Sequence, residues 1–509
     1  FCFCLTRVWH ATMTLAAERR QRLKPLPPHK RLSSRELGAL GDKVFCGEWF
    51  NIPIPPSLDC LKCEAFGAPW LTAAFHAAGT LPVENTVAAI TSFVELELQG
   101  DNAQGGAGMK ALLTVEYSDQ SDPNLHQCLF VKVPWKFEEN ATWRANLSSN
   151  GGDGDGRELS VSVLAEDLVP VRIPKLYFGD ISRESSNYVL ITECIPFGEA
   201  DPFYDGREVL PKCGKYQDDR LGNAQDYYIA LMRSLARLAA ADKRGVFDTI
   251  IDSFVNSKLP QKRRPTPDTA SRRSVSRDWT GQQVDAFVDF QRLAPNLFGR
   301  ELTEPVFIQD LRTQLIELSQ YFTAVTNWVA ADENYSALAH PNLQIDNAFF
   351  YSDGAGGLEA GLLDWYGTTR APFASIFLGC LSGASQEVLS QHLEAFMTCF
   401  VNEYALAGGP SISADVLLLQ FQLLSVQSLV GSFSFIESDI LKEGPPREEW
   451  ASIESKDDFR VMGRWNVRCR TIAILQQLKF WKDQDLYSRM VAWADTQGGL
   501  QLASGTRKP

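Results

Sequence analysis

The sequence predicts an α+β fold, in which a small antiparallel sheet lobe precedes a large and mostly helical lobe. Three observations support this fold class. Between residues 91 and 194, short apolar runs alternate with turn residues, which is typical of antiparallel strands. From residue 199 onward, apolar residues recur mainly every three or four positions, as they do on amphipathic helices. The 509 residues are 45% hydrophobic and 22% charged, so material for a sizeable core is ample.

The sheet lobe is expected at residues 65–198, after an irregular, proline-rich leader at 1–64. A helix is expected at 69–78, and a flexible, glycine-rich loop at 148–157 precedes a second helix at 158–165. Five strands are expected in this lobe, at 91–99, 110–117, 128–133, 175–179 and 188–194. A glycine-rich turn between the first two strands favours antiparallel pairing.

The helical lobe is expected at residues 199–500, with a tail at 501–509. Two apolar stripes with steps of three and four predict helices; they consist of Tyr228, Leu231, Leu235 and Leu238, and of Phe307, Leu311, Leu315, Leu318, Phe322, Val325 and Val329. Two short strands, 348–351 and 361–363, follow these stripes. The most apolar stretch, 416–435, contains three glutamines and four serines, so we expect a buried core helix and no membrane span.

Charge is unevenly distributed along the chain. The net charge of −13 argues against a general nucleic-acid binder, which needs a broad basic face. Residues 258–279 carry seven Lys or Arg and two acids, and we expect a mobile insert that is either simply solvated or attracts an anionic substrate or partner. Residues 1–31 carry seven Lys or Arg and one acid. This segment is either a frayed terminus or an organelle-import signal on an otherwise cytoplasmic protein.

Eleven cysteines are scattered through the chain, several of them inside apolar runs. This usage predicts buried free thiols in a reducing compartment rather than a disulfide framework. The apolar runs contain Cys128, Cys194, Cys380 and Cys399. Cys60 and Cys63 have the spacing of half a zinc site, but no second pair lies at a matching distance, so a structural metal and ordinary packing both remain open.

The strongest local signal is HPNLQIDNAFF at residues 340–350, followed by GLLDW at 361–365. Here the sequence resembles the catalytic segment of the aminoglycoside phosphotransferase, choline kinase and ecdysteroid-kinase-like families. These families share the protein-kinase fold and show His-x-Asp, an Asn five residues after that Asp, and Asp-Phe or Asp-Trp in a later strand. The resemblance covers roughly residues 65–400 and implies a two-lobed, protein-kinase-like fold.

The resemblance also implies a nucleotide site that binds ATP and Mg²⁺. Asn347 and Asp364 would supply oxygen ligands to the metal, which hard cations prefer. Lys132 would contact the α- and β-phosphates, and Glu158 would hold Lys132 in place, although each residue alone also suits a solvated charge or a helix-dipole role. His340 would brace the catalytic loop, 340–347, without taking part in the chemistry.

Two further parts of the nucleotide site are implied. Gly106 and Gly108 lie in a glycine run that offers backbone N–H groups to phosphates, and a flexible hairpin explains the same run equally well. The segment ITECIPFG, 191–198, is where the family has the hinge between its lobes. There, the backbone from Glu193 to Ile195 would bind the edge of the adenine.

One departure from the family pattern bears directly on activity. Asn342 stands where the family has its catalytic Asp, and Pro341 replaces the usual Gly. An amide accepts a hydrogen bond but takes no proton at neutral pH, and losing a general base typically costs about 10²- to 10⁴-fold in rate. Asp346 is a candidate substitute base, or alternatively an ordinary turn residue.

Three functional hypotheses follow. The first is an ATP- and Mg²⁺-dependent phosphotransferase acting on a hydroxyl of a small molecule, since phosphoryl transfer relies mainly on positioning and electrostatics. The second is a nucleotide-binding pseudokinase with a regulatory or scaffolding role, which would require a protein partner. The third is transfer of another part of the nucleotide, such as the adenylyl group. The acceptor stays unidentified, because the family sets it in the variable helical segment, here 199–335.

Overall fold

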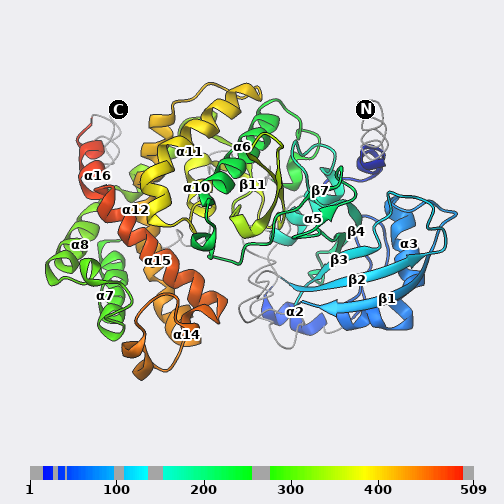
Figure 1. Ribbon diagram of the computed structural model, residues 1–509, viewed down its shortest axis with the longest axis horizontal. Coiled ribbons are helices and arrows are strands. Elements are labelled where there is room, and N and C mark those ends of the chain that lie inside the picture. Colours follow the sequence, from blue (N-terminus) through cyan, green and yellow to red (C-terminus); the bar gives the residue numbers. More distant parts are fainter. Residues whose placement is uncertain are drawn as a thin grey trace.

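The computed structural model describes residues 15–26, 33–40, 43–96, 108–135, 153–254 and 276–496. Two lobes lie side by side in Figure 1, where the blue and cyan part holds the main sheet and the green to red part is mostly helical. In the first lobe, three strands, a helix and two more strands follow one another along the chain. This is the two-lobed α+β fold that the sequence predicts, with a small antiparallel sheet lobe and a large, mostly helical lobe.

The N-terminal lobe is built on a five-stranded sheet with the order β1-β2-β3-β5-β4. Its strands are β1 (Val87–Glu95), β2 (Met109–Tyr117), β3 (Cys128–Val133), β4 (Leu176–Ser182) and β5 (Asn187–Glu193). All neighbouring pairs are antiparallel, as predicted. The first strand begins four residues earlier than expected, because Val87 pairs with Tyr117 at the end of β2. Residues 97–99 of the expected strand lie outside the described ranges.

The two faces of this sheet have different roles because successive strand residues point to opposite sides. In β2, Ala111, Leu113 and Val115 are buried in a cluster that includes helix α3 (Ala68–Ala78). The alternate row, with Lys110 and Leu112, lines a cavity instead. The apolar face therefore anchors the sheet, and the other face is left to bind ligands.

Helix α5 (Gly154–Leu164) begins earlier than predicted, so the expected loop at 148–157 is wrong from residue 154 onward. The Asp153 carboxylate caps the helix by accepting a hydrogen bond from the Gly156 N–H at 3.0 Å, and such caps stabilise helix starts. A β-carbon on Gly154 would lie 2.4 Å from the ring of Tyr366. Close packing, which the sequence does not reveal, thus explains a glycine that favours a loop by propensity. As a result, Glu158 lies inside the helix rather than at its start.

The C-terminal lobe is a helical assembly around one large core. Its helices are α6 (Ala224–Lys243), α7 (Arg277–Leu293), α8 (Pro305–Leu318), α9 (Phe322–Val329), α10 (Phe373–Cys380), α11 (Gln386–Leu406), α12 (Ala414–Phe433), α13 (Leu441–Glu443), α14 (Phe459–Met462), α15 (Trp465–Asp483) and α16 (Leu486–Asp495). The apolar stripe from Phe307 to Val329 spans α8 and α9, which are separated by one tighter turn at Ser319–Tyr321. Both predicted stripes face the core.

Helix α12 corresponds to the most apolar stretch of the sequence. Among the described residues, it is the one helix with the length and apolarity of a membrane span. Most of that window is buried inside the lobe, where α12 packs against α10, α15, α11 and α7. The predicted core helix is therefore present.

Short strands of the C-terminal lobe hold the segment that carries the sequence motif. They are β6 (Ala200–Asp201), β7 (Arg207–Glu208), β8 (Ser336–Ala339), β9 (Ala348–Ser352), β10 (Leu358–Leu362) and β11 (Thr369–Pro372). The predicted hairpin is formed by β9 and β10, with β10 starting three residues before its expected position. The β8–β11 pairing was not predicted. Together, the two ladders bring residues 340–347 beside residues 363–366.

The predicted leader is only partly irregular. Residues 15–22 are helical, and α2 (Ser34–Leu40) is a second helix. Most of the predicted basic insert lies outside the described residues, as does the tail at 501–509. The last residues of the insert belong to α7, which Ser276 caps by accepting a hydrogen bond from the Trp279 N–H.

Every cysteine in the described ranges is a free thiol. Cys380 is buried as predicted, whereas Cys194 and Cys399 are half-buried and Cys128 is exposed. Cys128 was predicted to be buried because its strand is apolar, but it lies at the strand's first position. The Cys63 thiol donates to the Cys60 carbonyl at 2.8 Å, and the described part of the chain contains no group of three or more His, Cys, Asp or Glu side chains suited to a metal.

Asp180 of β4 fastens residues 47–50 onto the sheet lobe. Its carboxylate accepts hydrogen bonds from the N–H groups of Trp49 at 3.0 Å and Phe50 at 2.9 Å. Burial raises the pKa of Asp180 to about 6, although these hydrogen bonds oppose the shift. Ionisation is therefore less favourable in the folded protein than in the unfolded chain, whose aspartates titrate near 3.9.

This pKa shift gives a pH-dependent stability prediction. Between about pH 4 and pH 6, the unfolded chain releases the Asp180 proton first, so the stability contributed by this group falls as the pH rises. The free energy of unfolding of the wild type, relative to Asp180→Asn, should drop by roughly 2 to 3 kcal/mol from pH 4 to pH 7. Urea unfolding of both proteins at several pH values measures this difference, and a constant difference would contradict it.

Candidate functional site

A cavity of about 690 Å³ lies between the two lobes. The sheet lobe contributes β2, β3, α5 and the chain after β5, and the helical lobe contributes loop 340–347 and residues 363–366. Most of the site residues expected from the sequence line this cavity; they are Lys132, Glu158, Glu193, Ile195, Asn342, Asp346, Asn347 and Asp364. The tertiary structure thus brings together residues that are more than 200 positions apart in the chain.

A chain of opposite charges crosses the inner end of the cavity. The ammonium group of Lys132, in β3, lies 2.7 and 2.8 Å from the two carboxylate oxygens of Glu158 in α5. It also lies 3.0 Å from an oxygen of Asp364, just after β10. Because Lys132 is only 2% exposed, these carboxylates are what compensate its buried charge.

The pKa shifts in this triad follow from burial and from mutual attraction. Burial alone would lower the pKa of Lys132, but the charges of Asp364 and Glu158 raise it well above its ordinary value. Burial alone would raise the pKa of Asp364, but Lys132 and Lys110 hold it well below its usual range. Lys132 is therefore protonated and Asp364 ionised throughout the neutral range. Asp364 also has a φ of 55°, a left-handed conformation that is uncommon outside glycine and is often found at functional sites.

His340 connects loop 340–347 to the segment that carries Asp364. One ring nitrogen, Nε2, donates to the Leu363 carbonyl at 2.8 Å, and Nδ1 accepts from the Asn342 N–H at 3.3 Å. Burial lowers the pKa of His340, which favours the neutral imidazole that this donor–acceptor pair requires. The Leu363 N–H in turn donates to the Asn347 carbonyl at 2.9 Å. His340 therefore positions the loop.

Asn347 is held so that its side-chain oxygen can accept a hydrogen bond or coordinate a metal ion. Its amide nitrogen donates to the Asn342 carbonyl at 2.7 Å, and the residue is 7% exposed and lines the cavity. The amide oxygen of Asn347 and the carboxylate of Asp364 are thus two oxygen donors on one cavity wall. Oxygen donors of these kinds are suited to Mg²⁺.

Asp346 is engaged elsewhere. One carboxylate oxygen lies 3.1 Å from the ammonium group of Lys215, which also donates to the Gln344 side chain at 2.8 Å. Burial alone would lower the pKa of Lys215, but Asp346 raises it above its ordinary value. The other carboxylate oxygen, Oδ1, is buried and makes no hydrogen bond within the described residues, and Asp346 lines the cavity. The role of Asp346 as a substitute base stays a prediction.

The hinge has one donor group available at the cavity. The Glu193 N–H donates to the Lys175 carbonyl at 2.9 Å, and the Cys194 N–H to the Cys128 carbonyl at 3.2 Å. Within the described ranges, the Ile195 N–H makes no hydrogen bond. Of the two hinge residues predicted to bind adenine, Ile195 therefore supplies the usable N–H group.

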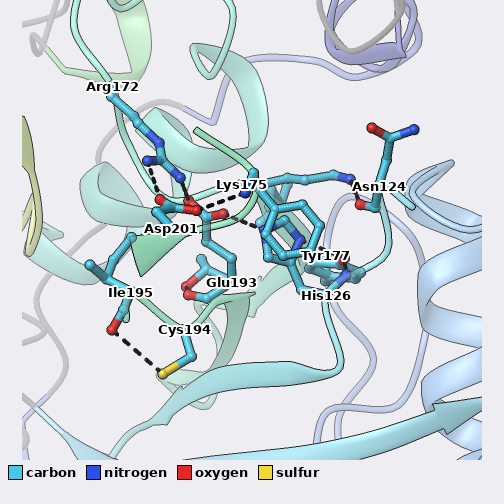
Figure 2. Close-up of polar contacts among 12 residues, drawn as sticks. Asn124, His126, Arg172, Lys175, Tyr177, Glu193, Cys194, Ile195 and Asp201 are labelled. Carbon is cyan, nitrogen blue, oxygen red and sulfur yellow. Dashed lines mark hydrogen bonds and ion pairs between the residues drawn. The ribbon is translucent and has the colours of Figure 1, made fainter. Parts of the chain in front are cut away.

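The Glu193 side chain has a structural role behind the hinge (Figure 2). Its carboxylate lies 2.6 Å from His126 and 3.1 Å from Arg172. Arg172 also pairs with Asp201, and the Tyr351 hydroxyl, in β9 of the helical lobe, donates to Asp201 at 2.9 Å. This buried network links the end of the sheet to the helical lobe and fixes the start of the hinge.

Neither of the two glycines expected to bind phosphate can be assigned that role. Gly106 lies outside the described residues. A β-carbon on Gly108 would lie 2.2 Å from the Val133 carbonyl oxygen and 2.5 Å from the Tyr188 hydroxyl. Close packing of β2 against the end of β3 therefore accounts for a glycine at position 108.

Two lysines at this site were not predicted from the sequence. Lys110 lies directly opposite Lys132 in the β2–β3 register, and burial lowers its pKa to about 8. Lys212 also lines the cavity, and burial lowers its pKa too. Alternation in β2 could have placed Lys110 opposite the apolar face. Its proximity to Lys132 depends on the strand register, which the sequence does not reveal.

Comparisons with known proteins find similarity only among solved structures. No protein-family model matches the chain, and no curated protein matches it. A spectinomycin phosphotransferase in complex with ADP and spectinomycin is 11% identical, with 82% of this chain and 93% of that chain covered and a TM-score of 0.37. A choline kinase from Cryptosporidium parvum is 10% identical, with coverages of 78% and 91% and a TM-score of 0.34. A microcompartment-associated aminopropanol kinase is 12% identical, with coverages of 81% and 94% and a TM-score of 0.35.

Proposed function

We propose that the chain is an ATP- and Mg²⁺-dependent phosphotransferase that acts on a hydroxyl group of a small molecule. The observation that carries this proposal is the buried Glu158–Lys132–Asp364 charge chain beside Asn347 in one interlobe cavity. A protonated lysine, held by a helix glutamate and placed next to two oxygen donors, is an arrangement suited to triphosphate recognition. A purely structural ion pair would not need a cavity at its side.

The groups that line the cavity are suited to the two ends of a nucleotide. Its hinge end offers the Ile195 N–H for the adenine edge, between apolar walls. The apolar side chains on these walls are Leu96, Leu112, Phe130, Ile173 and Leu190. At the inner end, the ammonium groups of Lys132 and Lys110 would attract the phosphates.

The oxygen ligands offered by the wall of the helical lobe are suited to Mg²⁺. The Asn347 amide oxygen and the Asp364 carboxylate would hold the ion, which commonly takes one or two protein carboxylates and completes its shell with phosphate oxygens and water. When bound, Mg²⁺ supplies charge neutralisation for the transferring phosphoryl group. Lys132, already in contact with Asp364, would keep that carboxylate ionised before the ion arrives.

Asn342 would orient the acceptor hydroxyl by accepting its hydrogen bond, without removing its proton. Because phosphoryl transfer depends mainly on positioning and charge stabilisation, we expect slow but real turnover. The same residue favours the second candidate, a nucleotide-binding pseudokinase that acts on a protein partner. Retention of both metal-ligand residues favours the enzyme.

Thermal stability of the purified protein tests nucleotide binding. A ligand that binds only the folded state adds RT ln(1 + [L]/Kd), about 2.7 kcal/mol at a hundredfold excess over Kd. We expect ATP with Mg²⁺ to raise the melting temperature, and ATP with a chelator to raise it much less. Absence of any shift with ATP, GTP or ADP would overturn the proposal.

Glu158→Gln tests the charge chain separately. The amide keeps the size of the side chain but removes the charge that holds Lys132. We therefore expect the Kd for Mg²⁺–ATP to rise by roughly tenfold, and the increase in melting temperature with Mg²⁺–ATP to become smaller. The matched control is Glu166→Gln, an acid just after α5 that pairs with Arg19 and does not line the cavity. Equal effects of the two substitutions would argue against a role for Glu158 at the site.

A further inference from the structure

We propose that Cys128 and Cys194 form a redox-active dithiol that closes reversibly into a disulfide at the hinge edge of the cavity. Neither cysteine has a role in the proposed phosphotransferase. The site formed by the two thiols stands on its own geometry. Its effect on nucleotide binding rests on the proposed function.

The sheet register places the two cysteines opposite each other. Leu129 pairs with Glu193 across β3 and β5, so the next antiparallel pair outward is Cys128 and Cys194. The Cys194 N–H donates to the Cys128 carbonyl at 3.2 Å, which continues the ladder by one step. Directly opposite residues of a hydrogen-bonded pair have Cα atoms about 5.5 Å apart and side chains on the same face. Disulfides span Cα separations of about 4.4 to 6.8 Å and Cβ separations of about 3.5 to 4.5 Å. Directly opposite Cβ atoms lie about 4.5 to 5.5 Å apart, so closure draws the adjoining ends of β3 and β5 slightly together.

The two thiols differ in a way that suits oxidation. Cys128 is exposed and Cys194 half-buried, so an oxidant in solution can reach the first. The neighbouring Cys194 thiol lowers the pKa of Cys128 to about 7, although partial burial opposes the shift. The Cys128 thiol and burial together raise the pKa of Cys194 far above its ordinary value. Cys128 is thus the thiolate that reacts first, and Cys194 is the resolving thiol.

The reaction balances with hydrogen peroxide as oxidant. The Cys128 thiolate attacks the O–O bond, an S–O bond forms, and hydroxide leaves and takes up a proton to give water. The Cys194 sulfur then attacks the resulting sulfenic acid, so that the S–S bond forms, the S–O bond breaks and a second water leaves. Two electrons pass from the two thiols to the peroxide. A dithiol reductant reverses the change.

Closure would act on the hinge because Cys194 is the residue before Ile195. In the reduced protein, the Cys194 thiol is directed at the Ile195 carbonyl at 3.9 Å (Figure 2). Forming the disulfide redirects that sulfur toward β3 and shifts the peptide that carries the Ile195 N–H. Loss of one hydrogen bond to the adenine should weaken nucleotide binding by roughly two- to tenfold.

Peptide mass spectrometry of the full chain after hydrogen peroxide tests the site. We expect one cross-linked pair, Cys128 with Cys194, which dithiothreitol removes. Cys194→Ser should instead leave Cys128 as a sulfenic acid that dimedone labels, and Cys46→Ser, which removes another exposed thiol, should form the disulfide as the wild type does. A sulfinic acid at Cys128 of the wild type without the disulfide, or a disulfide between other cysteines, would overturn the proposal.

Nucleotide affinity, measured by calorimetry on reduced and oxidised protein, tests the consequence. We expect oxidation to weaken Mg²⁺–ATP binding in the wild type and to leave Cys128→Ser unchanged. Equal affinity of the reduced and disulfide forms would overturn the effect on the hinge. If the reduced protein binds no nucleotide, the proposed function fails, and the mass spectra still decide whether the dithiol site is real.

Discussion

Asn342→Asp is expected to raise the rate of phosphoryl transfer by about 10²- to 10⁴-fold, the usual contribution of a general base. The substitution keeps the size and shape of the side chain. Its backbone is held independently of that side chain, because the Asn342 N–H donates to His340 and its carbonyl accepts from Asn347. The new carboxylate would therefore occupy the position of the amide and could take the proton of the acceptor hydroxyl.

Steady-state kinetics with a panel of small alcohols measures this gain, and the KM for ATP should change little. Asp346→Asn is the matched control in the same loop. Since Asp346 is bound to Lys215, its loss should leave the chemical step nearly unchanged, while disturbing the Lys215 contacts. If Asn342→Asp binds nucleotide normally and transfers no faster, Asn342 is suited to another role, and the pseudokinase becomes the better account.

Asp364→Asn is expected to remove the Mg²⁺-dependent part of nucleotide binding. The wild type should gain about 2.7 kcal/mol of stability at a hundredfold excess of Mg²⁺–ATP over Kd. The variant should gain no more stability from ATP with Mg²⁺ than from ATP with a chelator. Asparagine is the informative replacement because it tolerates the left-handed φ of 55° at this position. Alanine would add backbone strain and confuse a folding defect with a binding defect.

Thermal melts with and without Mg²⁺ give the comparison for both proteins. Without ligand, Asp364→Asn should fold normally, since Lys132 keeps its contacts with Glu158. Asp353→Asn is a suitable control, because that carboxylate caps the exposed turn between β9 and β10. A metal-dependent shift that survives in Asp364→Asn would show that the ion binds elsewhere.

Much of the site could be predicted because its chemistry is local. The spacing of His340, Asn342 and Asn347 within one loop, followed by Asp364, is readable along the chain. The structure places Asn342, Asn347 and Asp364 in one cavity, with His340 bonded to Asn342 and Leu363 behind them. The predicted strand at 128–133 also agrees with β3, since a short β-branched and apolar run specifies a strand by itself.

Predictions failed where packing outweighs local preference. Residues 154–157 contain two glycines and were expected to form a loop, yet they begin α5 because Asp153 caps them and Tyr366 packs against Gly154. Lys110 was not recognised as part of the site because its nearness to Lys132 depends on strand register. The ion pair between Asp346 and Lys215, which comes from a distant segment, was likewise not predicted.

The sequence by itself determined the order of the lobes, most of the regular elements and the identity of the candidate site residues. Hydrophobic periodicity and short motifs encode these features over a few neighbouring positions. The tertiary structure decided which charges compensate each other, which hinge N–H group is available, and that Cys128 faces Cys194. These contacts join residues 26 to 232 positions apart, and burial gives them their strength. Neither the pairing nor the burial is encoded in any local pattern.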